Sequence, residues 1–316
     1  MRGQPDSALK VLVTGGAGFI GSHVADAFLQ AGHEVHVLDD LSRGKLANLD
    51  PAVRVHRLDL RDPQVDQLLE DERYDVVSHH AAQIDVRRSV ADPMADADVN
   101  IMGSLRLLAA CARTGVKKVI YPSSGGAIYG EPQYLPTDEA HPIEPVSPYG
   151  VSKYVVELYL RQFQATHGLR YTVLRYPNVY GPRQDPLGEG GVVAIFAHRM
   201  LAGESVSIYG SGEQERDFVY VGDCARANLL ALQAGDGRAY NLGTGLGTSV
   251  NSLFRMMAGL TGYAKEPVYQ PARPGETMRM AVDATLAAQE LGWQPSVTLE
   301  EGLRRTIAAL SRGTPS

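Results

Sequence analysis

The sequence contains little cysteine, and its two cysteines, Cys111 and Cys224, lie far apart and outside any CxxC spacing. This pattern argues against a disulfide framework and against a thiolate metal site, so we expect both to be inert packing residues. The chain also lacks an apolar run as long as a transmembrane helix, and its first ten residues lack the apolar core of a signal peptide. We therefore expect a cytoplasmic protein without a membrane partner.

A block of basic residues is absent as well. The 316 residues include 36 acidic and 30 basic side chains, which gives a formal charge of −6 at pH 7. Nucleic acid is therefore not an expected partner, and any bound phosphate must be held by a few placed groups. A hydrophobic content of 44% with 21% charged residues is ordinary for a globular protein of one or two domains.

Short apolar runs alternate with amphipathic segments over the first half of the chain. The runs predicted as strands include "KVLVTG", "EVHVLDD", "DVVSHHAA" and "KKVIYPSS". Strands that alternate with helices predict a parallel sheet covered on both faces. After about residue 177 the runs shorten, and glycine and proline become dense. We predict a doubly wound α/β domain over residues 1–177 and a smaller, irregular α/β lobe over residues 178–316, with some exchange of chain between them.

A glycine-rich turn follows the first predicted strand. The stretch "VLVTGGAGFIG" has glycine at 15, 16, 18 and 21 and then opens a helical pattern, which is the context of a Rossmann-type dinucleotide fingerprint. Asp39 and Asp40 end the next strand, where a carboxylate is expected on the adenosine ribose and would repel a 2′-phosphate. NAD is the expected cofactor, although Ser42 and Arg43 follow at once and leave NADP open.

A tyrosine and a lysine lie one helical turn apart in "SPYGVSKYVVELYL". Tyr149 and Lys153 are spaced i and i+4, so they share one helix face. A nearby ammonium stabilises the ionised form of a phenol, which lets Tyr149 act as a general base. Taken alone, the pair is equally consistent with a surface tyrosine and a solvated lysine; the preceding dinucleotide fingerprint favours catalysis.

Several longer strings, among them "TGGAGFIGSH", "PSSGGAIYGE", "SPYGVSK", "RYPNVYGPRQ" and "RDFVYVGDCA", resemble the extended short-chain dehydrogenase/reductases. Within that superfamily the chain is most similar to the UDP-glucose (UDP-galactose) 4-epimerases. The resemblance implies interconversion of the two UDP-sugars at C4 through a transient 4-keto sugar. It also implies that Tyr149 is the base, that Lys153 is its partner, and that NAD stays bound through the cycle.

The expected site residues follow from these motifs and from the resemblance. The cofactor contacts are Gly15, Gly18, Phe19, Ile20, Gly21, Asp39, Asp40, Ser42, Arg43, Asp59, Leu60, Ala81, Ala82, Gln83, Asn100, Ser123, Tyr149, Lys153 and Tyr176. The substrate contacts are Ser124, Gly125, Gly126, Asn178, Val193, Tyr209, Arg216, Arg273 and Glu276. By the resemblance, the two arginines hold the diphosphate, Glu276 lies near a ribose, and Val193 and Tyr209 form the uracil wall.

The strand end "PSSGGAIYG" carries no acidic residue. Dehydratases and decarboxylases that resemble this chain have an acid there, which elimination or decarboxylation requires, whereas epimerisation does not. Aligned on "AIYG", the catalytic Ser or Thr of the family falls on Gly125. Ser124 is the expected substitute, and a water is the alternative.

Other interpretations stay open from the sequence. Another nucleotide-sugar epimerase, acting on N-acetylated sugars or on a UDP-hexuronate, shares most of these strings, and Met280 leaves room for N-acetylated sugars. A catalytically silent NAD-binding sensor is the alternative from another class. We expect a homodimer from the apolar helices over residues 101–112 and 153–163. No metal site is expected, because His79 and His80 lack further ligands at a suitable spacing.

Overall fold

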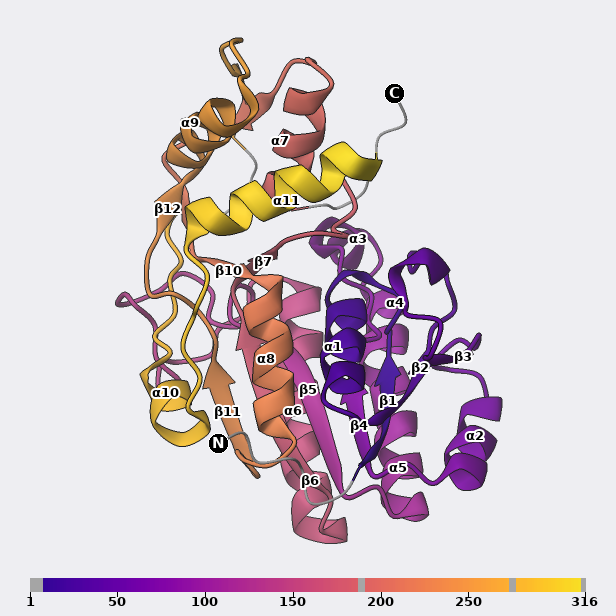
Figure 1. Cartoon of the computed structure of the whole chain (residues 1–316). Coiled ribbons are helices and arrows are strands. Elements are labelled where there is room, and N and C mark those ends of the chain that lie inside the picture. The colour runs from indigo at the N-terminus through magenta and orange to yellow at the C-terminus, as the bar shows by residue number, and fades with distance from the viewer. Residues whose placement is uncertain (1–7, 187–190, 273–276, 314–316) are drawn as a thin grey trace. The chain divides into compact units, whose positions relative to one another are not determined.

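The computed structural model describes residues 8–186, 191–272 and 277–313 (Figure 1). The chain divides into two compact units. The first unit comprises Met1–Ser123, Ser147–Leu174 and Ala225–Ala239, and the second comprises Ser124–Val146, Arg175–Cys224 and Tyr240–Ser316. Neither unit is one continuous stretch of sequence. The domain boundary that we predict after residue 177 stays a prediction.

A seven-stranded sheet has the order β11-β6-β5-β4-β1-β2-β3 in the described residues. Its strands are β1 (Lys10–Thr14), β2 (Glu34–Leu38), β3 (Arg54–His56), β4 (Val76–His79), β5 (Lys118–Ser124), β6 (Arg170–Tyr176) and β11 (Arg238–Asn241). β1 pairs in parallel with β2 on one side and with β4 on the other, so the strand order reverses there. The predicted doubly wound parallel sheet is confirmed, and dinucleotides bind at such a reversal.

Helices surround this sheet. They are α1 (Phe19–Gln30), α2 (Gln64–Glu72), α3 (Val86–Ala91), α4 (Pro93–Ala97), α5 (Ser104–Thr114), α6 (Pro148–His167) and α8 (Val221–Ala231), with the 3-10 turn η1 (Leu46–Asn48) and the π-helical η2 (Asp98–Gly103). Some of them, such as α3 and α4, pack against α6. Figure 1 shows α1 in front of the sheet and α5 behind it. None of the helices in the described part of the chain combines the length and apolarity needed to cross a bilayer.

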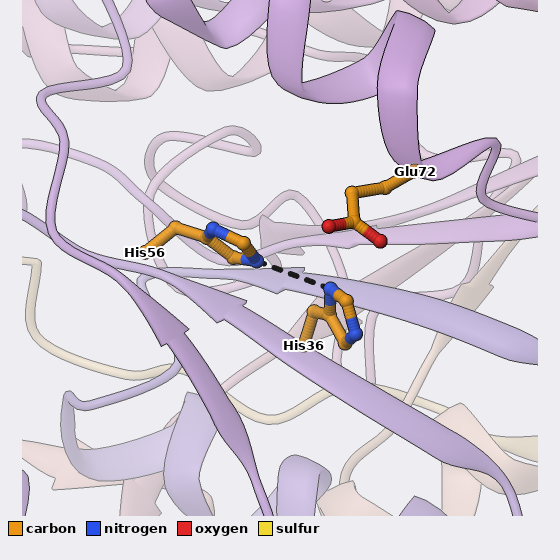
Figure 2. Close-up of side chains that lie close together, drawn as sticks. All are labelled: His36, His56 and Glu72. Atoms are coloured by element: carbon orange, nitrogen blue, oxygen red, sulfur yellow. Dashed lines mark hydrogen bonds between the residues drawn. The ribbon is translucent and has the colours of Figure 1, made fainter.

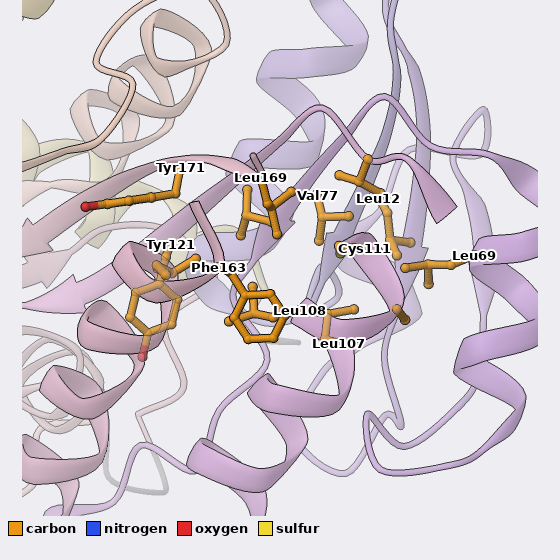
Figure 3. Packing of buried hydrophobic residues seen from close by; sticks show 14 of the residues in the cluster. Leu12, Leu69, Val77, Leu107, Leu108, Cys111, Tyr121, Phe163, Leu169 and Tyr171 are labelled. Atoms are coloured by element: carbon orange, nitrogen blue, oxygen red, sulfur yellow. The ribbon is translucent and has the colours of Figure 1, made fainter. Parts of the chain in front are cut away.

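The core of the first unit lies between the sheet and helices α2, α5 and α6. Leu12 of β1 and Val77 of β4 pack with Leu107 of α5 and Phe163 of α6 (Figure 3). The sheet residues come from short, continuous apolar runs, as expected for parallel strands buried on both faces. This packing fixes the carboxyl ends of the strands and the start of α6, and both carry predicted site residues.

The second unit is built from short elements. These are β7 (Asn178–Tyr180), α7 (Val192–Leu201), β8 (Ser207–Tyr209), β9 (Glu215–Arg216), β10 (Phe218–Tyr220), β12 (Thr248–Ser249), α9 (Val250–Thr261), β13 (Val268–Gln270), α10 (Thr285–Leu291) and α11 (Leu299–Gly313). Its strands form two-stranded sheets, and a separate apolar core includes Phe196 and Phe254, whose rings meet edge to face. The irregular α/β character predicted for the C-terminal part agrees with this architecture.

Candidate active site

The glycine turn between β1 and α1 brings backbone close to backbone. Gly15 has φ +64°, and a Cβ placed on it would lie 2.6 Å from the backbone nitrogen of Ala81, beyond the end of β4. Gly18 is the N-cap of α1 and contributes no side-chain cap. The first backbone N–H groups of a helix lack intrahelical partners, so the turn presents donors and a favourable dipole to an anion. Phe19, Ile20 and Gly21 form the first turn of this helix.

The substitution Gly15→Ala should destabilise the chain and lower its content of bound dinucleotide. Gly32→Ala is a matched control, because Gly32 also has a positive φ, +87°, but a Cβ placed on it would meet no described atom within 4 Å. The control measures only the loss in free energy of unfolding that follows from alanine in a left-handed backbone conformation, about 1–2 kcal/mol. The measurement is the free energy of unfolding in denaturant together with the NAD released from purified protein. Equal losses for the two variants would contradict a close-packed cradle.

The two acidic residues after β2 have different surroundings. Asp39 is buried, and its carboxylate accepts the backbone N–H groups of Ala17 at 3.0 Å and Leu41 at 2.8 Å. Burial raises the pKa of Asp39, although these hydrogen bonds oppose the shift. Asp40 is exposed and accepts both the backbone N–H and the hydroxyl of Ser42. Asp39 therefore braces the glycine turn, while Asp40 stands at the surface with the exposed side chains of Ser42 and Arg43.

A hydrogen-bonded network holds the segment after β4, where Ala81, Ala82 and Gln83 are half-buried. Buried Asn100, on η2, accepts the backbone N–H of Gln83 at 2.8 Å and donates to its carbonyl at 2.9 Å. The carboxylate of Asp96 accepts from the amides of both Gln83 and Asn100. Sequence reasoning found Asn100 but missed Asp96, because nothing local marks this aspartate as buried.

Asp59 and Leu60, two of the predicted cofactor contacts, follow β3. Arg61 binds the carboxylate of Asp59 through its side chain, which lowers the pKa of Asp59. Leu60 is buried in the core cluster, and its Cδ2 would lie 3.1 Å from a Cβ added to Gly103. These residues are therefore held in place by neighbours in the same unit.

Lys153 is buried in the second turn of α6. Its Nζ donates to the carbonyl of Pro122 on β5 at 2.9 Å and lies 4.7 Å from the ring centre of Tyr121. Burial lowers the pKa of Lys153 to about 8, while Asp96 and Glu157 act in the opposite direction. The ammonium is thus fixed beside the end of β5 and remains mostly charged at neutral pH.

Tyr149 is anchored one turn before the lysine. Ser147 caps α6 by accepting the backbone N–H of Gly150, and the backbone N–H of Tyr149 donates to the hydroxyl of Ser89 at 3.1 Å. The side chain of Tyr149 is half-buried. The predicted helical placement of the Tyr149 and Lys153 pair is therefore present in the structure, on a helix whose first turn is tied down.

Glu157 was missed by sequence reasoning. It lies four residues beyond Lys153 on α6 and is buried, although the rest of the buried face is largely apolar. Its charge favours the ammonium form of Lys153. The i+4 spacing from Lys153 could have indicated Glu157, because residues four apart lie on the same face of a helix.

The end of β5 carries the predicted hydroxyl groups. Among the described residues, the Oγ of Ser123 is one of two buried side-chain polar atoms without a hydrogen-bond partner. Ser124 is half-buried and belongs to the second unit. A Cβ added to Gly126 would lie 3.2 Å from Cε of Met280, 3.9 Å from Oδ1 of Asn178 and 4.0 Å from Oγ of Ser124. The second unit therefore brings Ser124, Gly126 and Asn178 together, and their role as substrate contacts stays a prediction.

The remaining predicted residues lie on several elements of the second unit. A Cβ on Gly125 would lie 3.3 Å from the carbonyl oxygen of Arg175. Tyr176 is buried at the end of β6, Val193 is buried in the apolar core on α7, Tyr209 is partly exposed at the end of β8, and Arg216 is half-buried on β9. Arg273 and Glu276 lie outside the described residues.

A doubly wound sheet, a glycine turn at its strand-order reversal and a Tyr/Lys pair at the start of α6 define a protein of the short-chain dehydrogenase/reductase type. The model of the NAD dependent epimerase/dehydratase family matches residues 11–243. The chain belongs to this family, which confirms the superfamily predicted from the motifs.

Similar proteins match this chain over nearly its whole length. A putative UDP-glucose 4-epimerase of Methanocaldococcus jannaschii is 46% identical and is matched over 94% of this chain and 97% of its own length. The structure of the Thermotoga maritima UDP-glucose 4-epimerase with UDP-glucose is 51% identical, with a TM-score of 0.95 over 96% of this chain and 99% of that chain. The Thermus thermophilus UDP-glucose 4-epimerase complex with NAD is 45% identical, with a TM-score of 0.91 over 97% and 100%.

Proposed function

We propose that the chain is an NAD-dependent epimerase that interconverts UDP-glucose and UDP-galactose at C4. The observation that carries this function is the near full-length likeness, in sequence and backbone, to the Thermotoga maritima enzyme with UDP-glucose. The intact Tyr149 and Lys153 pair supports an active enzyme rather than a silent sensor.

The first unit fits NAD. Gly15 and Gly21 leave no room for a Cβ beside neighbouring backbone, and Gly18 opens the N-terminus of a 12-residue helix, so a pyrophosphate can approach the chain closely. The carboxyl groups of Asp39 and Asp40 follow β2, where they favour NAD over NADP. When bound, NAD supplies the acceptor that holds the hydrogen of C4 as hydride and gives it back.

Tyr149 carries the proton transfers. Its phenolate accepts the proton of the sugar 4-hydroxyl and returns it after the sugar presents its other face. The Lys153 ammonium, held by the Pro122 carbonyl, stabilises the phenolate electrostatically. Between these transfers the protein must retain the 4-keto sugar, and Asn178 and Arg216 remain the proposed contacts for its sugar and diphosphate.

The end of β5 suits epimerisation better than elimination. Residues 123–126 are two serines and two glycines, so this strand end supplies hydroxyl groups and no carboxylic acid. Removal of water or carbon dioxide needs a further acid or base, whereas exchange of hydrogen at C4 needs none beyond Tyr149. Ser124 is the proposed hydrogen-bonding helper.

The function is tested by incubating the purified chain with UDP-galactose, without an added oxidant, and measuring UDP-glucose. Parallel reactions with UDP-N-acetylgalactosamine and a UDP-hexuronate identify the alternative epimerases. We expect UDP-galactose to be converted most efficiently. Conversion of another sugar alone would replace the proposed substrate, and no conversion at all would favour an NAD-binding sensor.

A homodimer is part of this proposal, because apolar side chains remain exposed on one face of α6. They include Val151, Leu158 and Tyr159, and Met102 of η2 is exposed as well.

Leu158→Glu should weaken self-association by about tenfold or more, since it places a charge in an apolar interface. Sedimentation equilibrium measures the effect, with Leu46→Glu as a control at an exposed leucine elsewhere. A monomeric wild-type chain, or equal effects of both variants, would contradict the interface.

A further inference from the structure

Two histidines and a glutamate meet at one edge of the seven-stranded sheet, and none of the three is among the predicted site residues. His36 lies on β2, His56 on the neighbouring edge strand β3, and Glu72 at the end of α2. One ligand atom from each lies within 4.8 Å of the others. Figure 2 shows the two imidazole rings and the carboxylate turned toward a common point.

The hydrogen bonds of His36 fix which ring nitrogen faces this point. Its Nε2 lies 3.1 Å from the carboxylate of Glu34, so Nε2 carries the hydrogen and donates it. Its Nδ1 lies 2.8 Å from the hydroxyl of Tyr74 and 3.1 Å from Nε2 of His56. Because Nε2 carries the hydrogen, Nδ1 is an acceptor, and the hydroxyl of Tyr74 donates to it. The lone pair of Nδ1 therefore faces the cluster, where a metal ion would displace the Tyr74 hydroxyl from it. The carboxylate of Glu34 lies behind the ring, as in metal-bound histidines.

The spacing of the nitrogens suits a tetrahedral metal ion. Two imidazole ligands at about 2.0–2.1 Å from zinc are about 3.3–3.4 Å apart, by the tetrahedral angle. Nδ1 of His36 and Nε2 of His56 are 3.1 Å apart.

The charges around the cluster are balanced. Lys10 and Arg54 form ion pairs with Glu72, and Lys10 also lies 3.5 Å from Glu34. Two cations thus face two carboxylates. The Lys10 ammonium and the Arg54 guanidinium both compete with a metal for Glu72. Both side chains are at least partly exposed and long enough to move into water.

We propose that His36, His56 and Glu72 bind one divalent transition-metal ion of the zinc class, with Glu34 orienting His36 and a water completing the coordination. Imidazole and carboxylate ligands suit zinc and cobalt rather than calcium or magnesium. Such an ion ties β2, β3 and α2 together at the sheet edge. The sequence predicts no metal site, because the three ligands are separated by 20 and 16 residues and form no motif.

The test uses the full-length chain, stripped of metal with a chelator and titrated with Co²⁺ and with Zn²⁺. We expect one equivalent of Co²⁺ to produce the intense d–d absorption of a four-coordinate site, and Zn²⁺ to displace it. His56→Gln and Glu72→Gln should remove saturable binding. His167→Gln, which changes an exposed histidine at the end of α6, should leave binding unchanged.

Two further variants separate ligation from a structural role. Glu34→Gln should weaken Co²⁺ binding by about 10- to 100-fold, because it removes the carboxylate behind His36. Lys10→Met should tighten binding, because it removes one of the two cations that compete for Glu72. A merely structural cluster predicts no gain of affinity from Lys10→Met.

Crystals of the wild-type chain grown with Zn²⁺ provide a measurement that needs no variant. Anomalous scattering at the zinc edge is expected to place one ion between His36, His56 and Glu72. An ion found elsewhere, no saturable binding up to about 1 mM metal, or binding that survives His56→Gln in folded protein would overturn the proposal.

Discussion

The Tyr149→Phe variant is expected to lose about 10²- to 10⁴-fold in kcat for the interconversion of UDP-galactose and UDP-glucose, which is the usual contribution of a positioned acid or base. Phenylalanine keeps the ring but removes the oxygen that exchanges a proton with the sugar. The KM should change far less than kcat, since the phenol acts mainly in the transition state. Initial rates over a range of UDP-galactose concentrations measure both constants.

Tyr263→Phe serves as the matched control for this result. Tyr263 follows α9 and donates its hydroxyl to the carbonyl of Glu204, so the control removes a hydrogen-bonded phenol oxygen from the second unit without touching α6. Its kcat should stay close to that of the wild type. A Tyr149→Phe enzyme that turned over as fast as this control would remove Tyr149 from the mechanism.

The Lys153→Met variant is expected to lose most of its activity while gaining stability. The loss follows because the phenolate of Tyr149 would no longer have an ammonium nearby. The gain follows because burial lowers the pKa of Lys153 from 10.5 to about 8, and such a shift corresponds to roughly 3 kcal/mol of lost stability at neutral pH. Methionine fills a similar volume without that cost, although the hydrogen bond to Pro122 is lost.

The pH dependence of stability tests the same shift. Between the folded pKa of Lys153, about 8, and its unfolded value of 10.5, the unfolded chain binds more protons, so this group makes stability rise with pH. The advantage of Lys153→Met in the free energy of unfolding should therefore be full below about pH 8 and shrink as pH rises toward 10.5. Urea denaturation of both proteins over this range measures it. A constant difference, or a less stable variant at neutral pH, would contradict the buried ammonium.

The sequence predicts those parts of the site that are local in the chain. The glycine turn and the Tyr149 and Lys153 pair each lie within one or two helical turns, so their spacing alone sets which groups face the same way. The sheet was predictable for a related reason, because parallel strands buried on both faces are continuous apolar runs.

Groups assembled by tertiary packing were not predictable in the same way. Asp96 becomes a buried acceptor only because α4 places it beside Gln83 and beside Asn100 of η2. His36 and His56 meet because β2 pairs with β3 in one register, with His36 opposite Arg54. A single-residue shift of that register would turn one imidazole to the other face of the sheet.

Different surroundings of adjacent residues at a strand end were also not predictable from the sequence. Asp39 and Asp40 are equivalent as sequence signals, yet the loop from Gly15 to Gly18 buries one and leaves the other exposed. Ser123 and Ser124 likewise differ, because the hydroxyl of Ser123 is buried without a partner in the described part of the chain, whereas that of Ser124 lies near Gly126. The role of Ser124 as the substitute for the hydroxyl missing at Gly125 stays a prediction.

The fate of the hydrogen at C4 tests the central claim most directly. UDP-galactose carrying deuterium at C4 is incubated with the purified chain in ordinary water, and the UDP-glucose formed is examined by NMR and mass spectrometry. Because the hydrogen that leaves C4 returns to the same carbon, the account predicts UDP-glucose that keeps its deuterium at C4. Exchange of that deuterium for solvent hydrogen, or recovery of UDP-galactose alone, would contradict it.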